Sequence, residues 1–266
     1  MKMNHIERSI QLIQNLSTNE PYNLGFSGGK DSIVLLDLVK RSGVPFNPVY
    51  ANTTMDPDGT IPFIRGNYPE VKIINPQKSF YQLIAEKGFP GRLRRWCCEE
   101  LKEKYGIGKR NIEGMRREES QKRANYEPEQ CDVRPWMKGA CHVLPLVNWT
   151  EIQIWDYIHK NDLPYMKYYD PPYNFKRHGC IGCPLASRMQ MRKEFQTFPK
   201  RAFAFMKAIE RHFEAKPKSM ISRTFLTKYE AFYFYVAGTT VAEFEQRKQA
   251  LFRPDFKAMI EEYLKV

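Results

Sequence analysis

The sequence predicts an α/β fold, a doubly wound and mostly parallel sheet that is followed by a mainly helical C-terminal extension. Three observations support this prediction. Short apolar runs alternate with helical patterns over the first two thirds of the chain, as βαβ units do. A pair of glycines separates the first apolar run from the first helical pattern. The last part of the chain lacks this alternation and is rich in aromatic and basic residues.

Five strand-like runs and four helical patterns make up the predicted α/β domain, which we place at residues 1–186. Each run is short and bounded by turn residues, and each helical pattern repeats apolar side chains at helical spacing. The runs are Asn23–Phe26, Pro48–Ala51, Val71–Ile74, Asn111–Gly114 and Val143–Leu146, and the helical patterns cover 31–41, 79–87, 95–105 and 150–161. Because ligands of such sheets bind at the carboxyl ends of the strands, residues that follow the strands are candidates for a site.

The turn after the first strand has the composition of a phosphate-binding loop. Its sequence is Phe26-Ser-Gly-Gly-Lys-Asp-Ser32. Gly28 and Gly29 permit close approach of the backbone, and the N–H groups at the start of the next helix attract an anion. Lys30 adds a positive charge, and Ser27 and Ser32 add hydroxyl groups. The spacing differs from that of the GxxxxGK[ST] loop, which holds β- and γ-phosphates.

Two residues follow other strands of the predicted sheet and are expected at the same edge. Thr53 comes after the second strand, and Arg116 comes after the fourth. We expect Thr53 to contact the adenosine of a nucleotide and Arg116 to contact a phosphate or the ribose. The alternative for each is a turn residue or a surface charge.

The chain is basic and contains no stretch that resembles a membrane span or a signal peptide. Its 266 residues include 42 Lys and Arg against 30 Asp and Glu, a formal net charge of +12. Such a charge favours a polyanionic partner or a highly phosphorylated ligand, although it can also serve solubility alone. Residues 1–20 contain no apolar core of a signal peptide. We therefore expect a cytoplasmic protein without a membrane partner.

Four of the six cysteines form a pattern typical of a metal site. Cys97 and Cys98 are adjacent, and Cys180 and Cys183 enclose two residues. Four thiolates are the right number for a cubane iron–sulfur cluster, whereas an adjacent pair is unusual for zinc. The chemistry of the residues favours a cluster and leaves structural zinc as the alternative.

Cys131 and Cys141 stand outside this pattern. We expect them to be buried structural thiols. The other interpretation is a persulfide carrier, because His142 follows Cys141 and a nearby imidazole can lower the pKa of a thiol. Adjacent side chains of a strand point to opposite faces, which disfavours that interpretation.

Taken together, the motifs resemble those of the phosphoadenosine phosphosulfate reductase superfamily. The Gly-rich turn is similar to the PP-loop, SGGKDS, of the ATP pyrophosphatases. The two cysteine elements lie in 95–102 and 179–184, residues 114–123 resemble the G-x-R-x-x-E-S…R element, and residues 145–165 resemble the P-L-x-x-W segment. These motifs occur in the family's order over roughly residues 20–186.

The resemblance implies a fold like that of the adenine nucleotide alpha hydrolases, and it implies roles for individual residues. The implied catalytic residues are Lys30, Asp31 and Arg116. The implied nucleotide-binding residues are Ser27, Gly28, Gly29, Lys30, Asp31, Ser32, Thr53, Gly114, Arg116, Glu119 and Arg123. The implied ligands of a [4Fe–4S] cluster are Cys97, Cys98, Cys180 and Cys183.

The resemblance also directs the expected function. Reductases of this superfamily use a cysteine in a C-terminal tail, and this sequence has no cysteine after Cys183. We therefore expect an ATP-dependent adenylating sulfurtransferase, similar to the ATP-pyrophosphatase component of DNA phosphorothioation systems, that uses ATP and Mg²⁺. The expected acceptor is nucleic acid (DNA or tRNA), and the expected sulfur donor is a cysteine desulfurase. The alternatives are a sulfonucleotide reductase and a non-catalytic nucleotide-binding assembly subunit.

Residues 187–266 are expected to form the C-terminal extension. They contain 15 of the 36 aromatic residues and carry a net charge of +7. Basic residues interleaved with aromatic ones can follow a nucleic-acid backbone and stack bases. The alternative is a helical extension whose aromatic residues pack on the α/β domain and whose charges face water.

Overall fold

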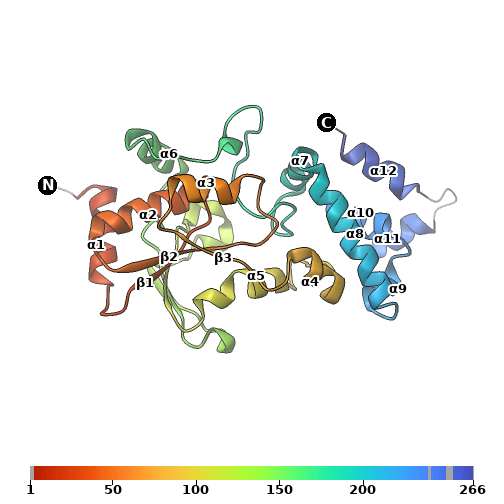
Figure 1. Ribbon diagram of the computed structural model, residues 1–266, viewed down its shortest axis with the longest axis horizontal. Coiled ribbons are helices and arrows are strands. Elements are labelled where there is room, and N and C mark those ends of the chain that lie inside the picture. Colours follow the sequence, from red (N-terminus) through yellow and green to blue (C-terminus); the bar gives the residue numbers. More distant parts are fainter. Residues whose placement is uncertain (1–2, 239–240, 250–253, 266) are drawn as a thin grey trace. The chain divides into compact units, whose positions relative to one another are not determined.

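The structure is a computed structural model that describes residues 3–238, 241–249 and 254–265 (Figure 1). The chain divides into two compact units. The first unit contains Met1–Asn52, Asp58–Pro76 and Glu99–Gly179, and the second contains Thr53–Pro57, Gln77–Cys98 and Cys180–Val266. This division differs from the predicted boundary between residues 186 and 187, because two earlier segments of the chain belong to the second unit.

A six-stranded sheet lies at the centre of the first unit, in the order β3-β2-β1-β4-β6-β5. Its strands are β1 (Tyr22–Gly25), β2 (Phe46–Ala51), β3 (Lys72–Ile74), β4 (Arg110–Ile112), β5 (Glu129–Cys131) and β6 (Cys141–Val143). All neighbouring strands run parallel except β5 and β6, which are antiparallel. The predicted mostly parallel sheet is confirmed.

Helices flank this sheet and bury its apolar side chains. They are α1 (His5–Asn15), α2 (Lys30–Ser42), α3 (Thr60–Asn67) and α6 (Glu151–Lys160). Helix α2 packs against α1 and α6, and its buried apolar residues extend from Ile33 to Val39. A capping box at Thr150 and Gln153 begins α6, since each side chain accepts a hydrogen bond from the other residue's backbone. The helices predicted at 31–41 and 150–161 are thereby confirmed.

Several elements differ from the prediction. The last predicted strand, Val143–Leu146, lies two residues too late, because β6 covers Cys141–Val143. Strand β5 and helices α1 and α3 were not predicted. The predicted helix at 95–105 is split into α5 (Trp96–Leu101) and a 3₁₀ turn at Glu103–Gly106.

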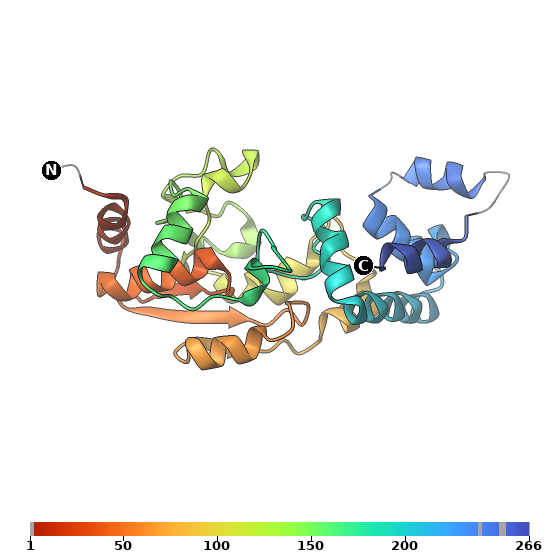
Figure 2. The same cartoon turned by 90° about the horizontal axis from the view of Figure 1, so that it is seen from above.

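The second unit is helical and has an aromatic core. It contains α4 (Phe80–Lys87), the first turn of α5, α7 (Arg188–Thr197), α8 (Pro199–Ala215), α9 (Met220–Thr224), α10 (Lys228–Ala237), α11 (Val241–Lys248) and α12 (Phe256–Tyr263). Helix α4 packs along α8, and α10 packs against α7, α8 and α12 (Figure 2). Phe195, Phe205, Phe232 and Phe244 are fully buried. The predicted C-terminal helices are present, and many of their aromatic side chains serve as core, whereas Phe203 is exposed.

In the described part of the chain, every helix is too short or too polar to cross a bilayer.

Candidate nucleotide site

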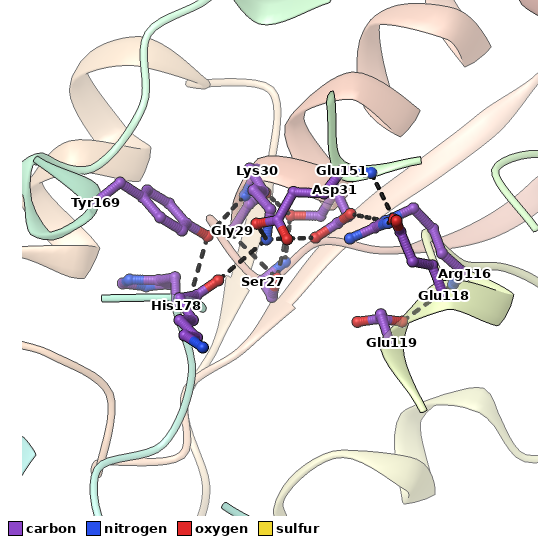
Figure 3. A network of polar contacts seen from close by, with 12 residues as sticks. Ser27, Gly29, Lys30, Asp31, Arg116, Glu118, Glu119, Glu151, Tyr169 and His178 are labelled. Carbon is purple, nitrogen blue, oxygen red and sulfur yellow. Dashed lines mark hydrogen bonds and ion pairs between the residues drawn. The ribbon is translucent and has the colours of Figure 1, made fainter. Parts of the chain in front are cut away.

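Residues 26–32, the PP-loop, follow β1, include the first turn of α2 and form the centre of the candidate site (Figure 3). Strand β1 ends at Gly25, and α2 begins at Lys30 with Gly29 as its N-cap. Gly28 has a φ of +75°, a backbone conformation that favours glycine. Gly29 has no side chain that could cap the helix. The first backbone N–H groups of α2 are therefore left to pair with acceptors from elsewhere, as at helix N-termini that bind anions.

The two serines of the PP-loop support the loop itself. Ser32 Oγ accepts a hydrogen bond from Ser27 N–H (3.2 Å) and donates one to Gly29 O (2.8 Å). Ser27 Oγ accepts one from Gly29 N–H at 3.2 Å. Ser27 is exposed, and Ser32 is buried. Their predicted contacts with phosphate stay predictions.

Lys30 is buried beside the loop, with 4% of its side chain exposed. Its Nζ donates to the backbone carbonyl of Lys176 at 3.2 Å. The same atom lies 3.5 Å from Asp31 Oδ2 and 3.6 Å from Glu151 Oε1. The ammonium group is therefore held among oxygen atoms, with which a phosphate would compete.

Tyr169 places its hydroxyl group at the N-terminus of α2 (Figure 3). The oxygen accepts hydrogen bonds from the backbone N–H groups of Lys30 (3.0 Å) and His178 (3.1 Å). Burial raises the pKa of Tyr169, so the phenol stays protonated near neutral pH. Tyr169 was not predicted as a site residue, because it lies outside the motifs that are recognisable in the sequence. The hydroxyl oxygen of Tyr169 thus accepts from a backbone N–H group at a helix N-terminus, the kind of group that binds anions.

Arg116 and Asp31 form an ion pair in the site. Arg116 is 3% exposed, and its Nε donates to Asp31 Oδ1 at 2.6 Å. Its Nη1 donates to Glu118 Oε2 (2.6 Å) and to the carbonyl of Trp149 (3.3 Å). Burial alone lowers the pKa of Arg116, but Asp31 and the two neighbouring glutamates raise it overall. The guanidinium is therefore charged and already has partners.

The other predicted residues that follow β4 lie around Arg116. Glu119 accepts the backbone N–H of Arg116 at 3.0 Å and forms an ion pair with Arg123. A Cβ atom at Gly114 would lie 2.9 Å from the backbone oxygen of Asp31, so only glycine fits there without a shift. The structure thus brings together the PP-loop and the segment after β4.

Thr53 belongs to the second unit. Its Oγ1 donates to Asp56 Oδ2 at 2.8 Å and lies 3.5 Å from Cys180 Sγ. The predicted contact with adenosine stays a prediction.

The four cysteines of the predicted metal site belong to the second unit, and none of them forms a disulfide. A hydrogen bond with Cys98, burial, and the charges of Cys98, Cys180 and Cys183 raise the pKa of Cys97. Among the residues that the structure describes, however, no group of three or more His, Cys, Asp or Glu side chains is arranged to hold a metal ion. The cluster therefore stays a prediction.

The prediction that Cys131 and Cys141 are buried thiols is wrong. The two residues face each other in the antiparallel β5–β6 pair and are joined in a disulfide. Cys131 is exposed. This proximity was not predicted, because β5 was not recognised in the sequence. His142 is paired elsewhere, with Nδ1 3.3 Å from Glu113 Oε2 and Nε2 3.5 Å from Asp132 Oδ2.

A pocket of about 370 Å³ lies next to Lys30. Its lining includes the aromatic residues Trp155, Tyr165 and Tyr169 and the charged residues Glu151, Asp170 and Lys176. None of these residues was singled out as a site residue from the sequence. Trp155 and Tyr165 lie within residues 145–165, which resemble a family motif. That resemblance is the signal in the sequence by which these two residues could have been found.

Known proteins are similar in sequence to this chain. The family model described as phosphoadenosine phosphosulfate reductase domain matches residues 21–186. An uncharacterised protein of Methanocaldococcus jannaschii is 29% identical over 212 residues, which cover 74% of this chain and 43% of that protein. The adenosine 5′-phosphosulfate reductase of Staphylococcus haemolyticus is 30% identical over 173 residues, 59% of this chain and 68% of the reductase.

The chain spans less than half the length of two Methanocaldococcus jannaschii relatives that it matches. Among solved structures, the phosphoadenylyl-sulfate reductase of Candida auris in a phosphate complex aligns with a TM-score of 0.48 and 18% identity. That alignment covers 65% of this chain and 87% of the reductase.

Proposed function

Because the chain belongs to the phosphoadenosine phosphosulfate reductase domain family, we propose that it is an ATP pyrophosphatase that adenylates an acceptor oxygen for replacement by sulfur. The acceptor oxygen attacks the α-phosphorus of ATP, and the new bond joins the acceptor to the AMP group. The bond between the α-phosphorus and the bridging oxygen breaks, and pyrophosphate leaves. The observation that carries this proposal is the PP-loop at the start of α2, with the ammonium group of Lys30 held beside it.

The site can stabilise the charge that develops on the leaving pyrophosphate. Backbone N–H groups at a helix N-terminus and a nearby ammonium group stabilise such charge when the fold holds them in place before the reaction. Lys30 supplies both the first N–H group of α2 and the positive charge. Mg²⁺ bound to the phosphates would supply further positive charge.

Arg116 is proposed to act mainly through Asp31. Its guanidinium holds the carboxylate that follows Lys30, and it is itself held by Glu118 and by the carbonyl of Trp149. This arrangement fixes the first turn of α2 and thereby orients the loop. A direct contact between Arg116 and a phosphate requires that one of these partners give way.

Sulfonucleotide reduction is the second candidate, and the name of the Staphylococcus haemolyticus relative favours it. That reaction needs a cysteine thiolate that attacks the sulfate sulfur. Outside the four-cysteine pattern the chain offers Cys131 and Cys141, which are joined to each other. This pairing supports adenylation over reduction.

Nucleic acid is proposed as the acceptor, and a cysteine desulfurase is proposed as the sulfur donor. The net charge of +12 supports a polyanionic acceptor. A persulfide of the donor would attack the adenylated atom, AMP would leave, and a thiol reductant would cleave the remaining S–S bond. We also propose Cys97, Cys98, Cys180 and Cys183 as ligands of a [4Fe–4S] cluster, to which no step of this reaction is assigned.

The test is the identity of the products formed from ATP, with and without single-stranded DNA or tRNA. The expected products are AMP and pyrophosphate, released faster when the acceptor is present. Formation of ADP and phosphate would contradict attack at the α-phosphorus. Thioredoxin-dependent release of sulfite from adenosine phosphosulfate would identify the chain as a reductase instead.

A further inference from the structure

The pocket beside the PP-loop has the size of a small-molecule site. Its volume is about 370 Å³, near the lower end of the range of about 300–1,000 Å³ for ligand pockets. All of its lining residues belong to the first unit, so the pocket is complete within that unit. One nucleoside-sized ligand fits such a volume better than a segment of another protein.

Three aromatic rings form a wall of this pocket. Trp155 meets Tyr165 and Tyr169 edge to face, with ring centroids 5.2 Å and 5.0 Å apart. His159 lies nearly parallel to Trp155 at 5.7 Å. Trp155 is half-buried, so packing fixes its ring while part of its surface stays accessible. Fixed aromatic rings of this kind are platforms on which nucleobases stack.

Carboxylates lie at the edge of the same pocket. Asp170 accepts a hydrogen bond from the hydroxyl of Tyr165 at 3.4 Å, and Glu151 is 52% exposed. Carboxylates accept hydrogen bonds from ring N–H and exocyclic amino groups, which nucleobases carry. The pocket therefore combines a stacking surface with acceptors at its rim.

Three contacts connect this pocket to the PP-loop, and those made by Tyr169 and Glu151 are drawn in Figure 3. The hydroxyl of Tyr169 accepts the backbone N–H of Lys30, and Glu151 Oε1 lies 3.6 Å from Lys30 Nζ. The carbonyl of Lys176 accepts a hydrogen bond from the same Nζ. A ligand in the pocket thus lies next to the phosphate site. Adenylation requires the acceptor close to the phosphates, because the attacking oxygen must approach the α-phosphorus.

We propose that this pocket binds the acceptor by taking one nucleobase, either unstacked from a single strand or supplied as a free nucleoside. The inference rests on the proposed function, since it assigns the pocket to the molecule that attacks ATP. Single-stranded nucleic acid is recognised by splaying out a base and stacking it on aromatic side chains. The basic charge of the chain would hold the phosphates that flank such a base.

The experiment measures stacking directly, without turnover. The probes are 2-aminopurine riboside and a short single-stranded oligonucleotide with one 2-aminopurine, whose fluorescence is quenched on stacking. The whole chain is compared with Trp155→Leu and Asp170→Asn. The matched control is Trp136→Leu, because Trp136 is a half-buried tryptophan of the same unit that lies under Arg134, outside the pocket.

We expect both the unaltered chain and Trp136→Leu to quench the probe. Trp155→Leu should weaken binding by about five-fold or more, the lower limit for a base that stacks on an aromatic side chain. Asp170→Asn should weaken it less. Binding of the riboside but not of the oligonucleotide would identify a free nucleoside as the ligand.

Three results would overturn the proposal. The first is equal binding by Trp155→Leu and the unaltered chain. The second is competition between the riboside and a non-hydrolysable ATP analogue, which would make the pocket the adenine site. The third is tighter binding of choline than of the riboside, because aromatic rings with nearby carboxylates also bind cations. Failure of the proposed function appears separately, as a lack of pyrophosphate release while stacking persists.

Discussion

The hydroxyl group of Tyr169 accepts a hydrogen bond of 3.0 Å from the backbone N–H of Lys30, the first residue of α2. The same oxygen accepts the N–H of His178 at 3.1 Å. Tyr169, which follows α6 in the sequence, thus accepts from the N–H group with which the PP-loop would bind a phosphate oxygen. Tyr169 and a phosphate oxygen would therefore compete for the same backbone N–H group.

The change Tyr169→Phe should increase the stabilisation of the protein by ATP. Removing the hydroxyl leaves two backbone N–H groups without their acceptor, at a cost of about 1–3 kcal/mol if no water replaces it. A phosphate that accepts from Lys30 recovers part of this loss. Thermal unfolding with and without ATP should therefore show a lower Tm without ATP and a larger ATP-induced shift than in the unaltered chain. Tyr165→Phe, which keeps the PP-loop contacts, is the control, and a smaller shift in Tyr169→Phe would contradict this competition.

The change Lys30→Ala should reduce pyrophosphate release by at least about 100-fold, because it removes a preorganised positive charge from the phosphate site. Lys30→Arg should also be poor, since a wide guanidinium does not replace a compact ammonium in an enclosed position. Lys40→Ala is the control, because Lys40 lies on the same helix and is substantially exposed. Rates of pyrophosphate release and circular dichroism spectra of all three variants provide the measurement. Full activity of Lys30→Arg would mean that the site needs only a charge.

Arg116→Met should destabilise the protein by about 3–5 kcal/mol, because it removes the buried guanidinium that pairs with both Asp31 and Glu118. The neighbouring Arg117 is more exposed and forms a longer ion pair, 3.6 Å, with Glu127. Arg117→Ala should therefore cost only about 1 kcal/mol or less. Urea unfolding of both variants measures the difference. Similar stabilities would show that the Arg116 ion pair contributes little to the fold.

Continuous motifs could be predicted from the sequence, whereas contacts between distant segments could not. The PP-loop was recognised because its glycines, lysine and serines are adjacent and lie between a strand and a helix. Tyr169 lies 139 residues from Lys30, and no local pattern connects them. Strand β5 is only three residues long, too short for the alternation that identifies strands. The disulfide between Cys131 and Cys141 was missed for the same reason.

The burial of a charged loop residue also depends on distant segments. Lys30 is enclosed by Asp31, Glu151 and the carbonyl of Lys176, and two of these three residues lie far from it in the sequence. Glu151 is the first residue of α6, and its proximity to the loop depends on how α6 packs against α2. Such packing is a property of the folded unit that the spacing of single residues does not reveal.

The contribution of His142 to stability should decrease as the pH rises. A hydrogen bond with Glu113 and the charges of Glu113 and Asp132 raise the pKa of His142, although burial alone lowers it. Its stabilising contribution is therefore complete below the unfolded value of about 6.5. It is lost as the pH rises through the higher pKa of the folded state. The difference in unfolding free energy between the unaltered chain and His142→Gln should shrink over this range.

His5 supplies a control of opposite sign. Burial and the charge of Arg8 lower the pKa of His5, so protonation of His5 opposes folding. The difference in unfolding free energy between the unaltered chain and His5→Gln should grow as the pH rises toward about 6.5. Equal slopes for the two variants would refute the assignment of the opposing shifts.

The chain prepared without oxygen should be brown and contain about four iron atoms per molecule, the content of a cubane cluster. Cys180→Ser and Cys183→Ser should lose the colour, the iron and part of the stability, because a metal centre bound only by the folded chain stabilises it. Cys131→Ser is the matched control and should keep the iron, since Cys131 is joined to Cys141 in the other unit. Metal analysis and absorbance near about 400 nm distinguish these variants. One zinc ion per chain and no iron would identify the structural zinc site that the cysteine pattern also permits.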